Sequence, residues 1–297
     1  MRGEGDTGRV LVLRELRSGV GGGIKEWGGE VTGSALGARL SATETAGIRV
    51  EIDRGVGRIT LDRSPVNVVD IPMLRQLRKV LGEVRGDGEV RCVLLQGAGK
   101  CFCAGVDVAD HTVDRVEKML KTFHQVIVAL RALPVPVVCA VHGAALGGGM
   151  EIAIACDVVI ARDDATLGQP EIKLGVFPPA AAAILPTLIG RQRAMDLILS
   201  GRSVGAVEAL AMGLVTSVFG AEQFAGGVEG YVARLASYSA PVLRLAKLAI
   251  DDGCRLGAEQ ALPSVERRYL TDLMTLSDPQ EGLQAWIAKR PPTWRHA

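Results

Sequence analysis

The chain has 297 residues, of which 48% are hydrophobic and 23% charged, and its formal net charge is +1. This length and apolar content are enough for one large domain or two smaller ones, while the near-neutral charge argues against nucleic acid or an anionic membrane as a partner. No apolar run approaches the roughly 20 residues that cross a bilayer. The six cysteines lie mostly inside apolar runs and lack zinc-ligand spacing, which predicts a reduced, cytoplasmic protein without a bound metal.

Residues 1–46 are rich in glycine, serine, threonine and charged residues. The apolar stretch Val10–Leu13 is too short for the core of a signal peptide, and the glycines 21–23 are not followed by a nucleotide-binding fingerprint. A composition of this kind favours an extension without stable structure. We therefore predict a disordered N-terminal extension over residues 1–46 and an ordered chain from residue 47.

The ordered part begins with alternating apolar residues in 48–52 and 58–61, separated by a glycine-containing turn, which predicts a β-hairpin. Residues 71–84 carry apolar side chains at helical spacing, and residues 90–95 form another apolar, strand-like run. Strand, helix and strand in this order predict a parallel sheet with right-handed crossovers.

Further along the chain, apolar positions from Val113 to Leu130 predict an amphipathic helix, and the β-branched run 135–141 predicts a buried strand. Residues 191–199 and 204–212 are expected to be helices that end at glycines, and the chain is expected to be helical from Ala240 onward. The fold class predicted from these elements is α/β.

Three consecutive glycines, 147–149, follow the predicted buried strand and open a new apolar segment in which Glu151 occupies the first helical turn. Glycines at such a junction allow close approach of a ligand, and unpaired N–H groups at a helix start stabilise negative charge. Glu171 follows in the loop Gly168-Gln169-Pro170-Glu171. Two carboxylates near such N–H groups suit proton transfer beside a carbonyl, although a first-turn glutamate also serves simply as a partner of the helix dipole.

The segments GAALGGGMEIAIACDVVIA and LGQPEIKLGVFP resemble the signature of the crotonase superfamily, the enoyl-CoA hydratases and isomerases. The loop FCAGVD (102–107), the segment SGRSVGAVEALAMGLV and the ending SDPQEGLQAWIAKRPPTWRHA also resemble family segments, so the likeness spans about residues 48–297. It implies a crotonase-like ββα-superhelix core over residues 47–235 and a C-terminal helical trimerisation region over residues 236–297.

The resemblance implies roles for four residues. By position, the main-chain N–H groups of Val106 and Gly148 would bind the thioester oxygen, while Glu151 and Glu171 would carry out acid–base work. Asp107 is expected to brace the loop rather than to react. Coenzyme A would be part of the substrate, and no cofactor is expected.

The resemblance also places residues around the substrate and its coenzyme A moiety. The loop before the first helix would contact the adenine end, His111 would line the acyl pocket, and basic groups of the C-terminal tail would approach the phosphates. These expected binding residues are Val66, Val68, Ala104, His111, Gly147, Phe177, Pro178, Lys289 and Arg295.

One stretch departs from the pattern of typical hydratases. Where these continue with a glycine-rich segment after the second glutamate, this chain has Phe177-Pro178-Pro179 followed by four alanines. Proline and alanine are stiffer than glycine, so the pocket wall is expected to differ in shape. Together with the pair Asp110-His111, this run resembles hydratases of cyclohexa-1,5-diene-1-carbonyl-CoA.

We therefore predict a hydro-lyase that adds water reversibly to an enoyl- or dienoyl-CoA thioester in fatty acid or aromatic acid metabolism. The alternatives are a Δ3,Δ2-enoyl-CoA isomerase that uses Glu171 alone, and a non-catalytic family member that binds coenzyme A or RNA. The near-zero charge and the presence of both glutamates argue against the second alternative. Neither a nucleic acid nor a membrane is expected as a partner, and the resemblance implies a homotrimer or homohexamer.

Overall fold

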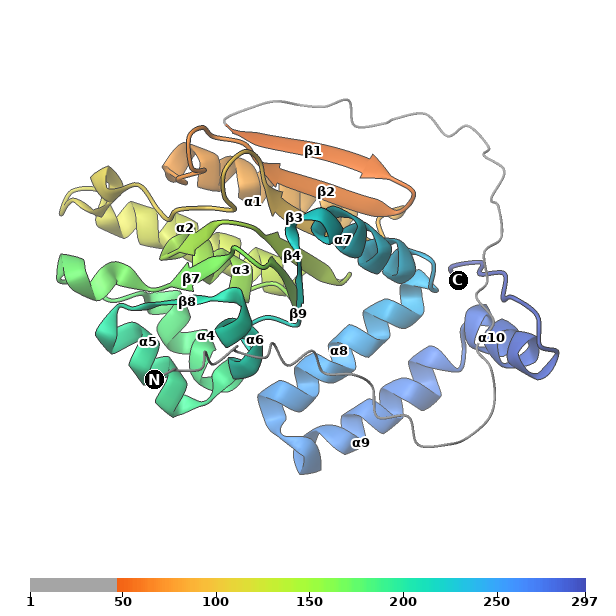
Figure 1. Cartoon of the computed structure of the whole chain (residues 1–297). Helices are drawn as coiled ribbons and strands as arrows, with labels where there is room; N and C mark the ends of the chain where they lie inside the picture. Colours follow the sequence, from red (N-terminus) through yellow and green to blue (C-terminus); the bar gives the residue numbers. More distant parts are fainter. Residues whose placement is uncertain (1–46) are drawn as a thin grey trace, which may run out of the picture. The chain divides into compact units, whose positions relative to one another are not determined.

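The computed structural model describes residues 47–297, so the extension predicted for residues 1–46 lies outside the described residues. Strands and helices alternate over the first part of this range, and helices alone follow (Figure 1). The strands are β1 (Ile48–Asp53), β2 (Val56–Leu61), β3 (Cys92–Gly97), β4 (Val137–Val141), β5 (Ala144–Leu146), β6 (Val158–Arg162), β7 (Thr166–Gly168), β8 (Ser203–Gly205) and β9 (Ser217–Phe219). The α-helices are α1 (Ile71–Gly86), α2 (Val116–Arg131), α3 (Gly148–Ile154), α4 (Pro179–Ile189), α5 (Arg191–Ser200), α6 (Ala206–Met212), α7 (Ala221–Ala236), α8 (Ala240–Leu256), α9 (Ala258–Arg268) and α10 (Ser277–Ile287).

The larger sheet has six strands in the order β1-β2-β3-β4-β6-β9. β1 and β2 form the predicted antiparallel hairpin, in which Ile48 pairs with Leu61, and every later neighbour in the sheet is parallel. The predicted strand–helix–strand order and the parallel sheet are therefore confirmed. The carboxyl ends of the parallel strands meet at one edge, where ligand sites of parallel α/β sheets are usually found.

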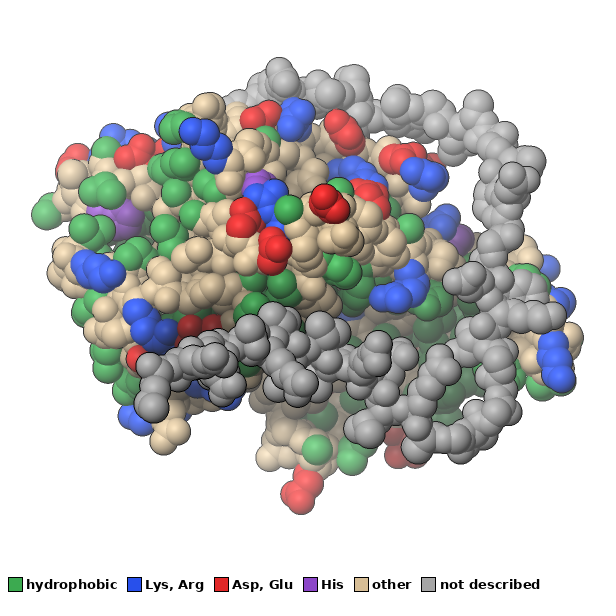
Figure 2. Space-filling model, in the orientation of Figure 1, with side chains coloured by type: hydrophobic (Ala, Val, Ile, Leu, Met, Phe, Trp, Pro, Cys, Tyr) green, Lys and Arg blue, Asp and Glu red, His purple; other side chains and the backbone are tan. Residues whose placement is uncertain are grey.

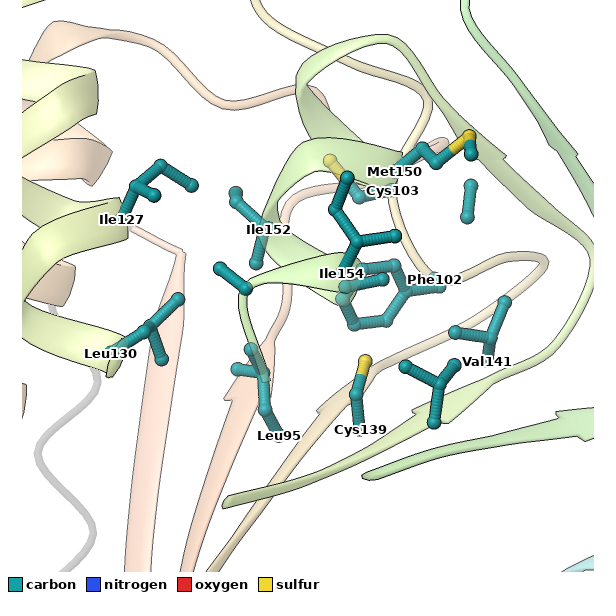
Figure 3. Close-up of a cluster of buried hydrophobic side chains, with 14 of the residues drawn as sticks. Leu95, Phe102, Cys103, Ile127, Leu130, Cys139, Val141, Met150, Ile152 and Ile154 are labelled. Atoms are coloured by element: carbon teal, nitrogen blue, oxygen red, sulfur yellow. The ribbon is translucent and has the colours of Figure 1, made fainter. Parts of the chain in front are cut away.

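The two faces of the larger sheet pack against different helices. Val93 and Leu95 of β3 belong to the main core with α1, α2 and α3, whereas Leu94 faces Val228 and Val232 of α7. This alternation follows from the two-residue period of a strand. Figure 3 shows part of the main core, in which Phe102 lies among side chains from the sheet, α2 and α3.

A smaller sheet, β5-β7-β8, was not predicted. Its strands have three residues each, too few to show a two-residue period in the sequence. β5 and β7 are parallel, so Leu146 pairs with Gly168. This pairing brings the segment before Gly147 beside the loop that contains Glu171.

Several predicted boundaries were wrong. The helix expected from Val113 begins at Val116, and Val113 is 98% exposed because it precedes the helix instead of joining its apolar face. The helix expected from Val204 begins at Ala206, because Val204 is the buried centre of β8. Helices α4 and α7 were not predicted at all.

The C-terminal helices are tied to the larger sheet by polar contacts. The Lys247 Nζ atom of α8 lies 2.6 Å from the Asp157 carboxylate, which also accepts a hydrogen bond of 2.7 Å from the Val137 N–H. Arg58 of β2 forms a two-pronged ion pair with Glu229 of α7, with distances of 2.5 and 2.6 Å. No helix within residues 47–297 is long and apolar enough to cross a membrane.

Candidate active site

Val106 lies on a loop that a parallel bridge holds beside Val69. The Val69 N–H donates to the Gly105 carbonyl, and the Asp107 N–H donates to the Val69 carbonyl, both at 2.9 Å. Because successive N–H groups of an extended chain point to opposite sides, the Val106 N–H points away from Val69. It has no hydrogen-bond acceptor among residues 47–297, and it is therefore available to a ligand.

Gly148 begins α3, where a main-chain N–H has no acceptor within the helix. A Cβ atom at this position would lie 2.5 Å from Cγ2 of Val106 and 3.2 Å from the ring of Phe123. Only glycine therefore fits, and the absence of a side chain brings the Gly148 backbone next to Val106. The two residues predicted to supply the N–H donors therefore lie next to each other.

Glu151 occupies the first turn of α3 and is 4% exposed. Its Oε1 atom accepts a hydrogen bond of 2.7 Å from the Ala181 N–H in the first turn of α4. Burial raises the pKa of the Glu151 carboxyl to about 7, and the negative charge of Glu171 adds to this shift while the Ala181 N–H opposes it. A carboxyl with this pKa can both donate and accept a proton near neutral pH.

Glu171 lies in the short turn η2 (Pro170–Leu174), and burial raises the pKa of its carboxyl. Gly147 has a φ of +52°, and a Cβ atom there would lie 2.6 Å from the Glu171 Oε1 atom. Glycine at 147 therefore lets this carboxylate approach the start of α3. The buried Gln169, with its amide nitrogen turned toward the carboxylate, lies 3.2 and 3.1 Å from the two Glu171 oxygens.

Gln169 and Ala181 are contacts that the sequence interpretation did not identify. Gln169 directly precedes Pro170-Glu171 in the motif. The sequence therefore shows its position but not that its side chain points toward the Glu171 carboxylate. Ala181 belongs to the run that was interpreted as a stiff wall. Proline at the first position of a helix is a helix-start signal, and Pro178-Pro179 carries that signal.

His111 ends the short turn η1 (Val108–His111), for which Asp107 is the capping residue. Its Nδ1 atom lies 3.0 Å from the Asp107 carbonyl, which can only accept, so Nδ1 donates, and Nε2 has no partner among residues 47–297. His111 is close enough to lower the pKa of Glu171, although burial outweighs this effect. The neighbouring Asp110 is buried and bonds the Ile71 N–H and Arg115.

The residues expected around coenzyme A fall into separate groups. The Ala104 N–H donates to the Val66 carbonyl at 3.0 Å, which joins the loop before α1 to the loop of Val106. The Val68 carbonyl accepts from Arg63 at 2.8 Å. Asn67, between them, is buried and its amide donates to the carbonyls of Ala98 and Cys101 at 2.8 Å each.

Beyond Glu171 the chain presents apolar side chains to solvent before α4 begins. Phe177 is 63% exposed, whereas Pro178 is buried at the start of α4. Figure 2 shows hydrophobic side chains gathered at the left edge of the molecule, in the region of α2 and the turn before α4. The exposed apolar residues of this edge are Val108, Val113, Ile172, Leu174, Val176 and Phe177.

The two predicted basic residues of the tail are not brought to the glutamates. The Lys289 N–H donates to the Trp286 carbonyl, and the Arg295 N–H donates to Asp278 at 2.8 Å. Within the described part of the chain, no contact joins either residue to Glu151 or Glu171. This part of the chain also contains no group of three histidine, cysteine or acidic side chains placed to hold a metal ion.

Comparison with known proteins decides the family. The family described as "Enoyl-CoA hydratase/isomerase" matches residues 51–297, five-sixths of the chain. The chain belongs to this family. The predicted crotonase superfamily, its fold and the presence of a C-terminal helical region are thereby confirmed.

Individual members of the family are similar over nearly their whole length. Cyclohexa-1,5-dienecarbonyl-CoA hydratase of Thauera aromatica is 37% identical over 247 residues, covering 83% of this chain and 95% of the relative. A probable enoyl-CoA hydratase of Mycobacterium bovis is 36% identical over 254 residues, covering 84% and 98%. The crystal structure of enoyl-CoA hydratase from Bacillus anthracis has a TM-score of 0.81 and 32% identity, covering 84% of this chain and 100% of that one. These family members are named hydratases, which are hydro-lyases, so the predicted enzyme class is confirmed.

Proposed function

We propose that this family member adds water reversibly to a conjugated enoyl- or dienoyl-CoA thioester. The observation that carries the proposal is the buried Glu151, whose pKa of about 7 is raised by burial and by the neighbouring Glu171. Hydration needs one group to take a proton from water and another to deliver a proton to the α-carbon. Two neighbouring carboxyls, one ionised and one protonated, meet both needs.

In this mechanism the thioester oxygen is bound between the N–H groups of Val106 and Gly148. Negative charge builds on that oxygen as water adds to the β-carbon, and the fixed N–H dipoles stabilise it. The loss of one such donor typically costs about 3 kcal/mol in the transition state. The Gly148 N–H also stands at the start of α3, where negative charge is favoured.

Glu151 and Glu171 divide the proton transfers. The ionised carboxyl accepts a proton from the attacking water, and the protonated one donates to the α-carbon. The Ala181 N–H holds Glu151 in place by donating to the Glu151 Oε1 atom, and the Gln169 amide faces the Glu171 carboxylate. The reaction in this scheme draws on main-chain dipoles and carboxyls alone, and coenzyme A enters as part of the substrate.

A cyclic substrate, cyclohexa-1,5-diene-1-carbonyl-CoA, is the finer proposal. The similarity to the Thauera aromatica hydratase supports it, as does the exposed apolar edge that ends in Phe177. His111, with a free Nε2 atom, would accept a hydrogen bond at the acyl end. Val66, Val68, Ala104 and Gly147 would contact the coenzyme A part through their backbones.

The test follows the absorbance of the conjugated thioester when purified protein is mixed with crotonyl-CoA or with the cyclic dienoyl-CoA. Loss of absorbance with crotonyl-CoA would assign a general enoyl-CoA hydratase, and loss with the cyclic ester alone would assign the ring-specific reaction. No change with either ester, despite measured binding, would refute hydration. Conversion of a 3-enoyl-CoA under the same conditions would then favour an isomerase.

We also propose self-association through the C-terminal helices, as a trimer or a pair of trimers. Large apolar side chains on this region are exposed in the single chain, among them Tyr269, Leu270, Leu283, Trp286 and Ile287. Apolar patches of this kind usually mark an interface. In such an assembly Lys289 and Arg295 would approach the coenzyme A phosphates of a neighbouring subunit, and light scattering after gel filtration measures the number of chains.

A further inference from the structure

A cavity of about 260 Å³ lies on the α7 side of the larger sheet, away from the two glutamates. Gln96 and Ala140, which pair in the register of β3 and β4, form its floor. Pockets for drug-sized ligands typically measure about 300–1,000 Å³, so this smaller cavity suits a ligand of one ring system. The lining residues are Gln96, Gly97, Gly99, Ala140, His142, Arg162 and Phe224.

Three polar side chains of the cavity keep unused hydrogen-bonding atoms. Arg162 binds Asp164 through Nε and Nη2, at 2.7 and 2.5 Å, which leaves Nη1. The Gln96 amide nitrogen donates to the Thr60 hydroxyl at 3.1 Å, which leaves Oε1. His142 Nε2 donates to the Gly99 carbonyl at 3.1 Å, and in the tautomer that carries its proton on Nε2 the Nδ1 atom is an acceptor.

None of these three atoms has a partner among residues 47–297, so the cavity offers one donor and two acceptors. Phe224, in the first turn of α7, adds an aromatic ring whose centroid is 6.5 Å from that of His142, with the two planes inclined by 56°. The inclined rings are not stacked on each other, and a planar ligand can stack on the phenyl face.

The charges around the cavity disfavour an anion. Asp164 pairs with Arg162, the one Lys or Arg side chain of the lining, and the adjacent Asp163 adds a second negative charge. Figure 2 likewise shows acidic and basic side chains close together on the face that carries α7. A neutral ligand is therefore favoured over a carboxylate or a phosphate.

The cavity touches both segments that lead to the candidate thioester-binding groups. Gly97 and Gly99 precede Val106, and His142 precedes Gly148. His142 joins the two segments, because its ring donates to Gly99 and its carbonyl accepts from the Phe102 N–H at 2.8 Å. A ligand in contact with His142 would therefore touch the residue that connects the two segments.

We propose that this cavity is a second binding site, for the uncharged base of an adenine nucleotide. An adenine ring is planar and offers both N–H donors, for Gln96 and His142, and nitrogen acceptors, for Arg162. The base has two sources, a free adenine nucleotide or a second molecule of coenzyme A. Binding at this site goes beyond the proposed hydration and does not depend on it.

Adenosine is the probe, and calorimetry or ligand-observed NMR measures its binding to the full-length protein with and without saturating coenzyme A. Two variants remove the site in different ways. Phe224→Ala takes away the stacking surface, and Ala140→Leu fills the cavity from the sheet. Tyr238→Ala is the matched control, because this half-exposed aromatic residue lies outside the cavity lining.

We expect adenosine to bind in the presence of coenzyme A, and both cavity variants to weaken its binding about tenfold or more, the loss expected for a stacking contact of 1–3 kcal/mol. Tyr238→Ala should bind as the wild type does. If coenzyme A displaces adenosine and both cavity variants lose adenosine binding, the natural occupant of the site is the adenine base of coenzyme A. Absence of binding at about 10 mM adenosine, or binding that neither variant changes, would overturn the proposal.

Adenosine should also change turnover if the hydration mechanism is correct. Because the cavity lies behind both thioester-binding segments, kcat should change more than KM, and Ala140→Leu should abolish the response. This second readout rests on the proposed function. If the protein binds adenosine but does not hydrate either ester, the proposed function is refuted while the proposed binding site stands.

Discussion

The segments that carry Val106 and Gly148 differ from the segment that follows Glu171 in how closely neighbours enclose them. A Cβ atom at Gly148 would collide with Val106, and one at Gly149 would overlap the Cys103 carbonyl. By contrast, Leu174 and Phe177 are both more than 60% exposed. We therefore propose that the enclosed backbone holds the reacting groups in place, while the exposed side chains contact the acyl group.

The largest expected effect lies where the two regions meet, at the glutamates. Replacing Glu151 or Glu171 by Gln removes a proton donor and acceptor while keeping the shape, so kcat should fall by about 10²–10⁴. Binding of the coenzyme A ester, measured by calorimetry, should stay within a few-fold of the wild type. Glu117→Gln, at an exposed position of α2, is the control. Unchanged turnover in both variants would contradict the mechanism.

A smaller but still large effect is expected within the enclosed region. In Gly148→Ala the added methyl group would push Val106 away, since the Cβ atom would lie 2.5 Å from its Cγ2 atom. We expect kcat to fall by about 10²–10³, the effect of losing one oxyanion donor. Gly82→Ala, in α1 with open space around its Cβ position, should leave kcat unchanged. Equal activity of the two variants would show that the N–H groups do not bind the thioester.

Burial of Glu151 should also be visible in the free energy of unfolding. Its pKa rises from 4.5 to about 7 on folding, so the folded state favours the protonated carboxyl. The resulting stabilisation is complete below pH 4.5 and is lost as the pH rises through 7, by about 3 kcal/mol in total. The Glu151→Gln variant has no ionisable group at this position, so its stability lacks this pH dependence.

Urea unfolding of both proteins, at equal concentration, measures this difference. The variant should gain stability relative to the wild type between about pH 5 and pH 8.5, because only the wild type must ionise a buried carboxyl. A difference that stays constant over this range would mean that Glu151 is not buried as a carboxyl with a raised pKa.

The smallest effect is expected in the exposed region. Phe177→Ala should change the ratio of kcat/KM for the cyclic dienoyl-CoA and crotonyl-CoA by about tenfold, because an exposed ring buries only part of its surface on a substrate. Leu199→Ala on α5 is the matched control, since Leu199 is 62% exposed and Phe177 is 63% exposed. An unchanged ratio would mean that this edge does not contact the acyl group.

Elements in which apolar residues recur regularly over many positions could be predicted from the sequence. Elements that exist only through pairing with distant segments could not. The hairpin 48–61 and helix α1 carry a clear two- or four-residue period and were identified. Helix α7 contains Gly226, Gly227 and Gly230, which conceal its helical pattern. The three-residue strands of the smaller sheet exist only through their partners.

The candidate site divides in the same way. Glu151, Glu171, Val106 and Gly148 came from motifs, and the structure brings them together. The hydrogen bond from Ala181 to Glu151 joins residues 30 positions apart, and no local pattern contains such a contact. Asp110, grouped with His111 in the sequence, instead bonds the start of α1 and Arg115. Asp110 therefore has a structural role at a helix start, and the two adjacent residues in the sequence do not show which of them is buried.

The Lys247–Asp157 contact limits how far this protein can be divided into parts. Lys247 is buried and belongs to α8, whereas Asp157 stands just before β6 and also holds the Val137 N–H at the start of β4. A fragment that ends before Ala240 would keep the acid and lose its cation. Because the Asp157 side chain is 29% exposed, water would screen its charge in such a fragment, so the electrostatic loss would be small. The fragment would also lose the hydrogen bond from Lys247 to the Val135 carbonyl, so the starts of β4 and β6 would no longer be tied to α8.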